Sequence, residues 1–135
     1  MPPLDKLLPI PDPASRPFFD AALEGQLLLQ RCTNCAQAWF PFFSHCAVCN
    51  QPDLEWEIAS GKGRVYMHGR MHQVFHPELA ESVPYQLAIV ELEEGVRVVT
   101  QLVDTESARI RAGAPVEVTF ERLSEEVAIP KFRLS

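Results

Sequence analysis

Apolar and polar positions alternate in short runs along the second half of the chain. Five such runs cover residues 64–74, 84–92, 96–103, 115–123 and 127–134. Alternation with a period of two places the apolar side chains of a run on one face, which predicts a strand. Glu93-Glu94-Gly95 is expected to form a tight hairpin turn, and residues 104–114 a longer connection with a short helix at 106–111. This order predicts a five-stranded OB-fold barrel, with an SH3-like barrel as the alternative.

Closely spaced prolines and a short helical pattern mark the N-terminal part of the chain. Residues 1–14 hold five of the twelve prolines, with leucine and isoleucine side chains between them. Such a segment predicts an extended arm that has no core of its own and must lie on another surface. Ser15 is expected to cap a short helix that has Pro17 in its first turn and ends at Gly25.

Three short β segments follow, at residues 26–31, 38–43 and 54–58, and predict a small ribbon. The middle segment is a hairpin rich in aromatic side chains: Trp39, Phe40, Phe42 and Phe43. These rings are expected to pack over a site too small to build a core, and a ligand-stacking platform is the alternative. The chain is therefore expected to be mostly β, with an arm at 1–14, a helix plus ribbon at 15–60 and an OB-fold domain at 61–135.

All four cysteines lie in two C-x-x-C pairs that ten residues separate: Cys32, Cys35, Cys46 and Cys49. Such pairs bring four thiolates to one tetrahedral ion, because each tight turn supplies two ligands. The spacing predicts a structural zinc site in a rubredoxin-like ribbon, with iron as the alternative metal. Disulfides or free core thiols are the other interpretations, although a disulfide framework normally spreads its cysteines along the chain.

The residues beside the cysteines affect the geometry of this site. A knuckle of this kind favours a left-handed backbone just after its second cysteine, where this chain has Ala36 and Asn50. Asparagine tolerates that conformation better than alanine, so mild strain is expected in the first knuckle. His45 precedes Cys46 but is interpreted as a neighbour, because four cysteines already fill a tetrahedral shell.

Composition and charge narrow the class of protein further. The chain has 135 residues, 47% of them hydrophobic, and twelve basic against eighteen acidic residues give a net charge of -6. This is a globular composition, and its acidic balance is opposite to that of most proteins that hold nucleic acids by charge. The sequence has no apolar run of about 20 residues and no basic-then-apolar start. A cytoplasmic protein without a membrane span or signal peptide is therefore expected.

Several motifs occur in the order helix, cysteine knuckles and barrel over residues 17–132. They are Gly61-Lys62-Gly63-Arg64-Val65-Tyr66, Phe75-His76-Pro77, Val83-Pro84-Tyr85, Val90-Glu91-Leu92-Glu93-Glu94-Gly95-Val96-Arg97, Gly113-Ala114-Pro115-Val116-Glu117-Val118 and Ile129-Pro130-Lys131-Phe132. With these motifs the chain resembles the small rubredoxin-like zinc-ribbon plus OB-fold proteins associated with acyl-CoA metabolism. Ala36 and Asn50 depart from the glycines at the knuckle positions of that family.

The resemblance implies an accessory subunit and not a free-standing enzyme. Members of the family are partners of thiolase-like enzymes, namely thiolases, acyltransferases and sterol side-chain aldolases, and some accompany enoyl-CoA hydratases. In such assemblies the ribbon and the OB domain hold enzymes together and help to shape or cover a channel for CoA, while the catalytic residues belong to the partner. The resemblance therefore implies a scaffold that docks on such an enzyme and assists acyl-CoA binding or channelling.

An independent acyl-CoA enzyme is the alternative that the histidines raise. His68, His72 and His76 recur every four residues, but on a strand such positions stand about 13 Å apart, too far to share one ion. His76 and Glu78 could act as an acid–base pair, although Pro77 between them indicates a loop corner. If the four cysteines bind metal, no thiol is left as a nucleophile, so no catalytic residue is expected.

Single-stranded nucleic acid is an alternative, because zinc ribbons and OB folds both occur in proteins that bind it. Residues 61–135 hold nine basic and eleven acidic residues, and their aromatic rings are scattered singly, which argues against such a surface.

CoA needs fewer positive charges than a nucleic acid does, because two or three positioned cations can hold its phosphates. The ligand-binding residues that we expect are Arg64, Arg70, Arg109 and Arg111, with ordinary solvated arginines as the alternative. Arg64 and Arg70 are six positions apart on one predicted strand, so they are expected to share a face.

Overall fold

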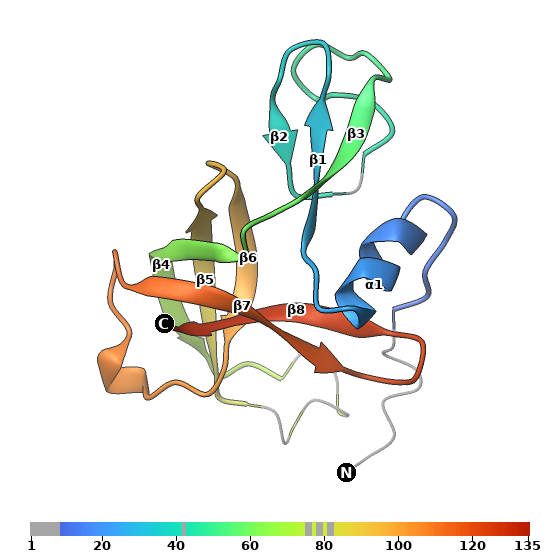
Figure 1. Ribbon diagram of the computed structural model, residues 1–135. Coiled ribbons are helices and arrows are strands. Elements are labelled where there is room, and N and C mark those ends of the chain that lie inside the picture. The colour runs from blue at the N-terminus through green and yellow to red at the C-terminus, as the bar shows by residue number, and fades with distance from the viewer. Residues whose placement is uncertain (1–8, 42, 75–76, 78–79, 81–82) are drawn as a thin grey trace.

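The computed structural model describes residues 9–41, 43–74, 77, 80 and 83–135, which form two sheets and one α-helix (Figure 1). The cysteine knuckles lie at the far end of a three-stranded sheet, and a closed five-stranded barrel makes up the C-terminal part of the chain. The helix packs beside the last barrel strand. The structure confirms the prediction of a mostly β protein in which a helix and a ribbon precede a barrel.

The barrel consists of β4 (Lys62–Met71), β5 (Tyr85–Leu92), β6 (Arg97–Leu102), β7 (Pro115–Arg122) and β8 (Ala128–Leu134). These strands close in the order β4-β5-β6-β8-β7, in which β6 and β8 are parallel and the other neighbours are antiparallel. A barrel whose third strand lies beside its fifth has the Greek-key connection of an OB fold. The strand order therefore confirms the OB-fold prediction over the SH3-like alternative.

Two boundaries in the barrel differ from the predicted ones. β4 ends at Met71, so residues 72–74 are not part of the strand. The predicted helix at 106–111 is a single 3₁₀ turn, η3 (Ser107–Arg109). Ile110 explains why the turn stops, because its backbone is extended (φ -79°, ψ 125°) and its side chain is buried in the core. Burial of this apolar side chain outweighs continuation of the helix.

Helix α1 (Arg16–Leu23) begins after Ser15 and ends before Gly25, as predicted. At its C-terminus Gly25 has a left-handed backbone (φ 78°), and its N–H donates to the carbonyl of Ala22 at 3.1 Å. Ser15 occupies the N-cap position, but its hydroxyl does not bond a helical N–H. The hydroxyl donates instead to the carboxylate of Asp12 at 2.7 Å, so the predicted side-chain cap is wrong.

The ribbon consists of β1 (Leu28–Cys32), β2 (Ala38–Trp39) and β3 (Leu54–Ile58) in the order β2-β1-β3. β2 is only two residues long, so the predicted aromatic hairpin at 38–43 is mostly irregular. The Phe40 ring lies edge-on against Phe18 of α1, with 5.5 Å between the ring centroids. Phe40 thus packs against the core of the protein, and the prediction that it covers the cysteine site is wrong. Phe42 lies outside the described residues.

One hydrophobic core joins the helix, the ribbon and the barrel. Phe18 of α1, Leu29 of β1, and Val90 and Phe132 of the barrel belong to a single cluster of buried side chains. Leu29, Val90 and Phe132 have no exposed surface. The ribbon and the barrel therefore share apolar packing across residue 60, where the sequence predicts a domain boundary.

The N-terminal arm is described only in part. Residues 1–8 lie outside the described residues, and Ile10 near the end of the arm is 92% exposed, so its side chain is not packed on the core. Within the described part of the chain, no helix has the length and the apolar character that crossing a membrane requires.

Candidate metal centre

The four cysteines of the two C-x-x-C pairs meet at the end of the ribbon. Their Sγ atoms lie within 4.8 Å of one another, with 3.6 Å between Cys32 and Cys49 and 3.5 Å between Cys35 and Cys46. A tetrahedron with zinc–sulfur bonds of about 2.3 Å places its sulfurs about 3.8 Å apart, whereas a disulfide needs about 2.0 Å. None of the four is in a disulfide, so together they form a zinc-ribbon-like cluster that can hold one metal ion.

The two knuckles repeat one pattern of backbone hydrogen bonds. In each knuckle, the carbonyl of the first cysteine accepts a bond at 2.8 Å, and the N–H of that cysteine donates one at 2.9 Å. The bonds are Ala36 N to Cys32 O, Cys32 N to Gln37 O, Asn50 N to Cys46 O and Cys46 N to Gln51 O. Because these backbone groups satisfy one another, each turn holds two thiols near one point without a core of its own.

The residue after the second cysteine has a left-handed backbone in both knuckles, as predicted. The φ angle is 64° at Ala36 and 58° at Asn50. A left-handed backbone places the Cβ atom close to a carbonyl oxygen, and asparagine offsets part of this strain by local hydrogen bonding, which alanine cannot do. The strain of the pair is therefore concentrated at Ala36.

Ala36→Gly is expected to stabilise the metal-bound chain by about 0.5–1 kcal/mol, because glycine removes the strain but has more freedom in the unfolded chain. Asn50→Gly changes the equivalent position of the other knuckle and is expected to alter stability less. Urea titration with metal present gives the free energy of unfolding of both variants. A clear loss of stability in Ala36→Gly would show that its backbone is not strained.

Hydrogen-bond donors to the cysteines of the second knuckle favour thiolates, the form of cysteine that binds metals. In the first knuckle the backbone N–H of Gln37 acts in the same direction, but burial and hydrogen bonds with the other cysteines outweigh it and raise the pKa of Cys35 to about 12. The Asn34 side-chain amide, 3.5 Å from Sγ of Cys49, and the backbone N–H of Gln51 lower the pKa of Cys49 to about 6. Burial acts in the opposite direction at Cys46, but the backbone N–H groups of Cys49 and Val48 still hold the pKa of Cys46 below its usual value. The second knuckle thus supplies donors suited to a bound cation.

Arg31 connects the first knuckle to the neighbouring strand. Its guanidinium donates to the carbonyl of Ala36 at 2.7 Å and to both carboxylate oxygens of Glu57 at 3.0 and 2.9 Å. This bidentate pair raises the pKa of Arg31 and lowers the pKa of Glu57. Arg31 and Asn34 were not predicted as parts of this site, because neither residue belongs to a metal-ligand motif.

The arrangement suits a structural ion better than a catalytic one. Four cysteines complete a tetrahedral shell, so a bound ion has no open position at which to activate water. His45 is exposed and lies 3.0 Å from the hydroxyl of Ser44 through its Nδ1 atom. It is not part of the sulfur cluster, in agreement with its interpretation as a neighbour.

A β-bulge at residues 65–67 of β4 overturns one expectation about the arginines. Arg64 is opposite Glu91 on β5, whereas Arg70 is opposite Gln86. Glu91 and Gln86 are an odd number of positions apart, so they point to opposite faces of the sheet, and so do the arginines paired with them. The prediction that Arg64 and Arg70 share a face is wrong, because the bulge inserts one extra residue between them.

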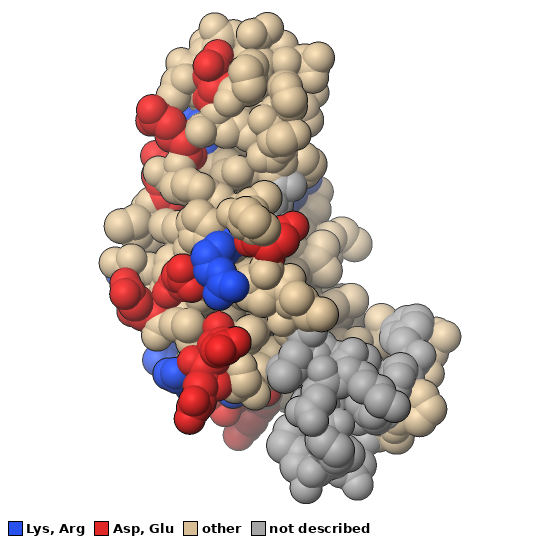
Figure 2. Space-filling model, turned by 90° about the vertical axis from the view of Figure 1, so that its right-hand side faces the viewer, with Lys and Arg blue, Asp and Glu red and all other residues tan. Residues whose placement is uncertain are grey.

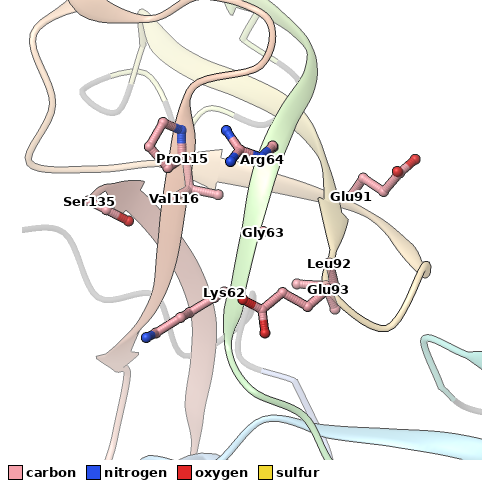
Figure 3. Close-up of a pocket in the computed structure, with 9 residues that line it drawn as sticks. All are labelled: Lys62, Gly63, Arg64, Glu91, Leu92, Glu93, Pro115, Val116 and Ser135. Carbon is pink, nitrogen blue, oxygen red and sulfur yellow. The ribbon is translucent and has the colours of Figure 1, made fainter.

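Arg64 lines a surface pocket of about 370 Å³ together with Lys62, Glu91 and Glu93 (Figure 3). Its guanidinium donates to the backbone carbonyl of Gly113 at 3.0 Å. The lining of this pocket holds two cations and two carboxylates, and one of these carboxylates, Glu91, is paired with Arg97 at 3.0 Å. The pocket is therefore of mixed charge and not a purely basic site for a phosphate group.

Arg70 lines a different cavity, of about 450 Å³, with Asp104 and Ser107. Ser107 begins η3, which ends at Arg109, and Arg111 follows in the same loop as an exposed residue. The structure therefore brings Arg70 near the start of the loop that carries Arg109 and Arg111, whereas Arg64 contacts the end of that loop through Gly113, two residues beyond Arg111.

Within its described residues, the structure gives no support to a histidine metal site or a basic nucleic-acid surface. Among the described residues, the only group of three or more potential metal ligands that meet is the cysteine cluster. His76 and Glu78, which the sequence pattern disfavours as an acid–base pair, lie outside the described residues. Figure 2 shows carboxylates around a few cations on one face, without a continuous basic stripe on the described part of that face. Such mixed charge does not suit a nucleic-acid backbone.

Comparisons with known proteins agree on one family. The model of the family described as "ChsH2, C-terminal OB-fold domain" matches residues 56–121. A DUF35 domain-containing scaffold protein of Methanocaldococcus jannaschii is 38% identical over 97 residues, which are 71% of this chain and 68% of that protein. A probable enoyl-CoA hydratase alpha subunit of Thermomonospora curvata is 36% identical over 116 residues, 86% of this chain. The chain spans only 36% of the length of that subunit.

Solved structures give the same result. The structure titled "Ltp2-ChsH2(DUF35) aldolase" has a chain that matches with a TM-score of 0.79 and 34% identity, over 94% of this chain and 98% of that one. A DUF35 protein of Sulfolobus solfataricus matches with a TM-score of 0.59 at 13% identity, which supports the fold alone. The scaffold proteins and the aldolase chain are similar to this protein over most of their own length. The chain therefore belongs to the family of DUF35 domain-containing proteins.

Proposed function

We propose that this protein is a non-catalytic accessory subunit that docks on a thiolase-like enzyme, an aldolase or an enoyl-CoA hydratase and assists acyl-CoA binding or channelling. The observation that carries the proposal is the match over 98% of a chain in an aldolase structure, at 34% identity. Relatives named as scaffold proteins and as a hydratase alpha subunit support the same role. The closed ligand shell of the cysteine cluster fits a structural role for the metal.

The metal in this proposal is one zinc ion per chain, held by Cys32, Cys35, Cys46 and Cys49. Four thiolates at tetrahedral spacing suit zinc, and iron in a rubredoxin-like site is the alternative. The ion would fix the two knuckles to each other and so stiffen the ribbon. In the proposed domain division, the helix and the ribbon together make up residues 15–60.

The arginines are proposed as contacts for the phosphates of CoA, at two places and not one. Arg70 lines the cavity beside η3, which ends at Arg109, whereas Arg64 lines a pocket of mixed charge and bonds Gly113, two residues beyond Arg111. Because Arg64 and Arg70 lie on opposite faces of β4, a single phosphate group cannot contact both side chains.

A tagged chain, used as bait in its source cell and washed at moderate salt, is expected to retain a thiolase-like enzyme, aldolase or hydratase in near-stoichiometric amount. Mass spectrometry identifies the retained proteins, and the enzyme then defines the acyl-CoA class. The purified chain alone should show no turnover of acyl-CoA thioesters, because it is expected to lack a catalytic nucleophile.

Two results would contradict the proposal. Turnover of acyl-CoA by the isolated chain at enzymatic rates would make it an enzyme. Retention of RNA-associated proteins alone, lost after nuclease treatment, would favour the nucleic-acid alternative, and binding to single-stranded RNA should then fall steeply as salt rises.

A further inference from the structure

The two knuckles share a pattern of backbone hydrogen bonds but differ in the two residues between the cysteines of each pair. The first knuckle has Thr33 and Asn34, whereas the second has Ala47 and Val48 at the same positions. All four residues are exposed, so burial does not fix their side chains. Only the two residues of the first knuckle have polar side-chain atoms with which to hold a neighbouring group in place.

Thr33 and Asn34 both bond to the second knuckle or to the chain just after it. The N–H and the hydroxyl of Thr33 donate to the carbonyl of Asp53 at 2.8 and 3.1 Å. The side-chain amide of Asn34 donates to Sγ of Cys49 at 3.5 Å. A thiolate only accepts hydrogen bonds, so the amide nitrogen of Asn34 is the atom suited to face this sulfur. These bonds connect the two knuckles independently of a metal ion.

The second knuckle does not return these contacts. Ala47 and Val48 have no polar side-chain atom. The bond made from this position comes from the backbone N–H of Val48, which donates to Sγ of Cys46 in the same knuckle at 3.4 Å. Side-chain donation between the knuckles therefore runs in one direction, from the first to the second.

Cys49 is a ligand whose position depends on such a bond. Cys32 and Cys46 are buried, so the surrounding chain fixes their side chains. Cys49 is only half-buried, and packing restricts its side chain less. Hydrogen bonds from outside the ligand shell orient metal ligands, and their loss typically lowers metal affinity about 10- to 100-fold. The amide of Asn34 supplies such a bond to a thiol that packing alone does not hold.

We infer that Asn34 is the positioning residue of the metal centre. Its amide orients Sγ of Cys49 toward the point that the four sulfurs share, and the bonds of Thr33 hold the two knuckles together before an ion binds. Asn34 acts through Cys49 and is not itself a ligand, because the atom that faces the cluster is a hydrogen-bond donor. The inference rests on the metal centre of the proposed function and is independent of which enzyme the chain accompanies.

Zinc affinity of the full chain, measured by competition with a chromogenic chelator, tests this role. Asn34→Ala is expected to bind Zn²⁺ about tenfold more weakly, because Cys49 loses the donor that orients it. Val48→Ala truncates the side chain at the equivalent position of the second knuckle and should bind Zn²⁺ as tightly as the wild-type chain, since that side chain donates no hydrogen bond. Wild-type affinity in Asn34→Ala, or equal losses in the two variants, would overturn the inference.

Co²⁺ in place of Zn²⁺ gives a readout that a loss of folding stability alone would not change. The sulfur-to-cobalt charge-transfer absorption depends on the electron density of the sulfurs, which a hydrogen bond stabilises. Loss of the amide in Asn34→Ala should therefore move this absorption to longer wavelength. Weaker binding with an unchanged spectrum would give Asn34 a merely structural role and contradict the inference. If the wild-type chain binds neither ion, the proposed metal centre itself fails; if it binds both and Asn34→Ala matches it, only the inference fails.

Discussion

Cys32→Ser is expected to abolish stable metal binding and to unfold the knuckle end of the ribbon while the barrel stays folded. Cys32 has no exposed surface and supplies one of the four thiolate ligands, so its replacement leaves the ion with three thiolates and a gap on the buried side of the cluster. Structural zinc contributes roughly 10–16 kcal/mol in small zinc domains, more than the apolar contacts at this end of the ribbon can replace. Metal analysis should show a fall from about one zinc per chain to almost none.

The damage should be local because the two ends of the ribbon are held by different forces. The knuckles lie at the tip of the ribbon, away from the barrel (Figure 1). Leu27 and Leu29, at the other end of β1, are buried in the core that the helix and the barrel share. In ¹H–¹⁵N spectra, we therefore expect dispersed signals from residues 32–53 to collapse, while signals from β5 and β6 remain.

His45→Ala is the matched control, because it removes a possible ligand atom beside Cys46 without touching the sulfur cluster. This variant should keep its metal and its unfolding temperature. Removal of the metal from the wild-type chain by a chelator should reproduce the spectrum of Cys32→Ser. A chelated chain whose unfolding temperature matches that of the metal-bound chain would falsify the structural role of the ion.

The elements that could be predicted from sequence are those set by local patterns. Alternation of apolar residues predicted all five barrel strands, because one face of each strand is buried and the other is exposed to solvent. The C-x-x-C pairs marked the cysteine cluster, since the ligand spacing of a knuckle is a local property. The left-handed backbone at Ala36 and Asn50 followed from the same turn geometry.

The wrong predictions concern side chains and strands whose interaction partners lie far away in sequence, or for which a second nearby partner competes. The bulge in β4 depends on its pairing with β5, so nothing in the sequence indicated that Arg64 and Arg70 would be on opposite faces. Phe40 was assigned to the metal site, but its ring packs against Phe18 of the helix. Ser15 was expected to cap the helix, but the carboxylate of Asp12 offers its hydroxyl a charged acceptor three residues away.

Phe132→Ala is expected to destabilise the whole chain by about 3–5 kcal/mol, because it removes a fully buried aromatic ring and leaves a cavity. Phe132 has no exposed surface and lies on β8 opposite Val118 of β7 and beside Leu102 of β6, where the barrel closes. A domain of this size is stable by only about 5–15 kcal/mol, so the loss takes up a large part of its stability. Urea unfolding followed by far-UV circular dichroism measures it. Val99→Ala, a valine truncation on the exposed face of β6, should cost less than about 1 kcal/mol.

Phe132→Ala also tests whether the ribbon and the barrel unfold together. Both tryptophans, Trp39 and Trp56, belong to the ribbon, so their fluorescence reports on the ribbon, whereas circular dichroism reports mainly on the barrel strands. Because Phe132 and Leu29 belong to one buried cluster, removal of the Phe132 ring should lower both unfolding midpoints by the same amount. A fall in the circular dichroism midpoint alone would mean that the ribbon and the barrel fold as independent units, as the predicted boundary at residue 60 implies.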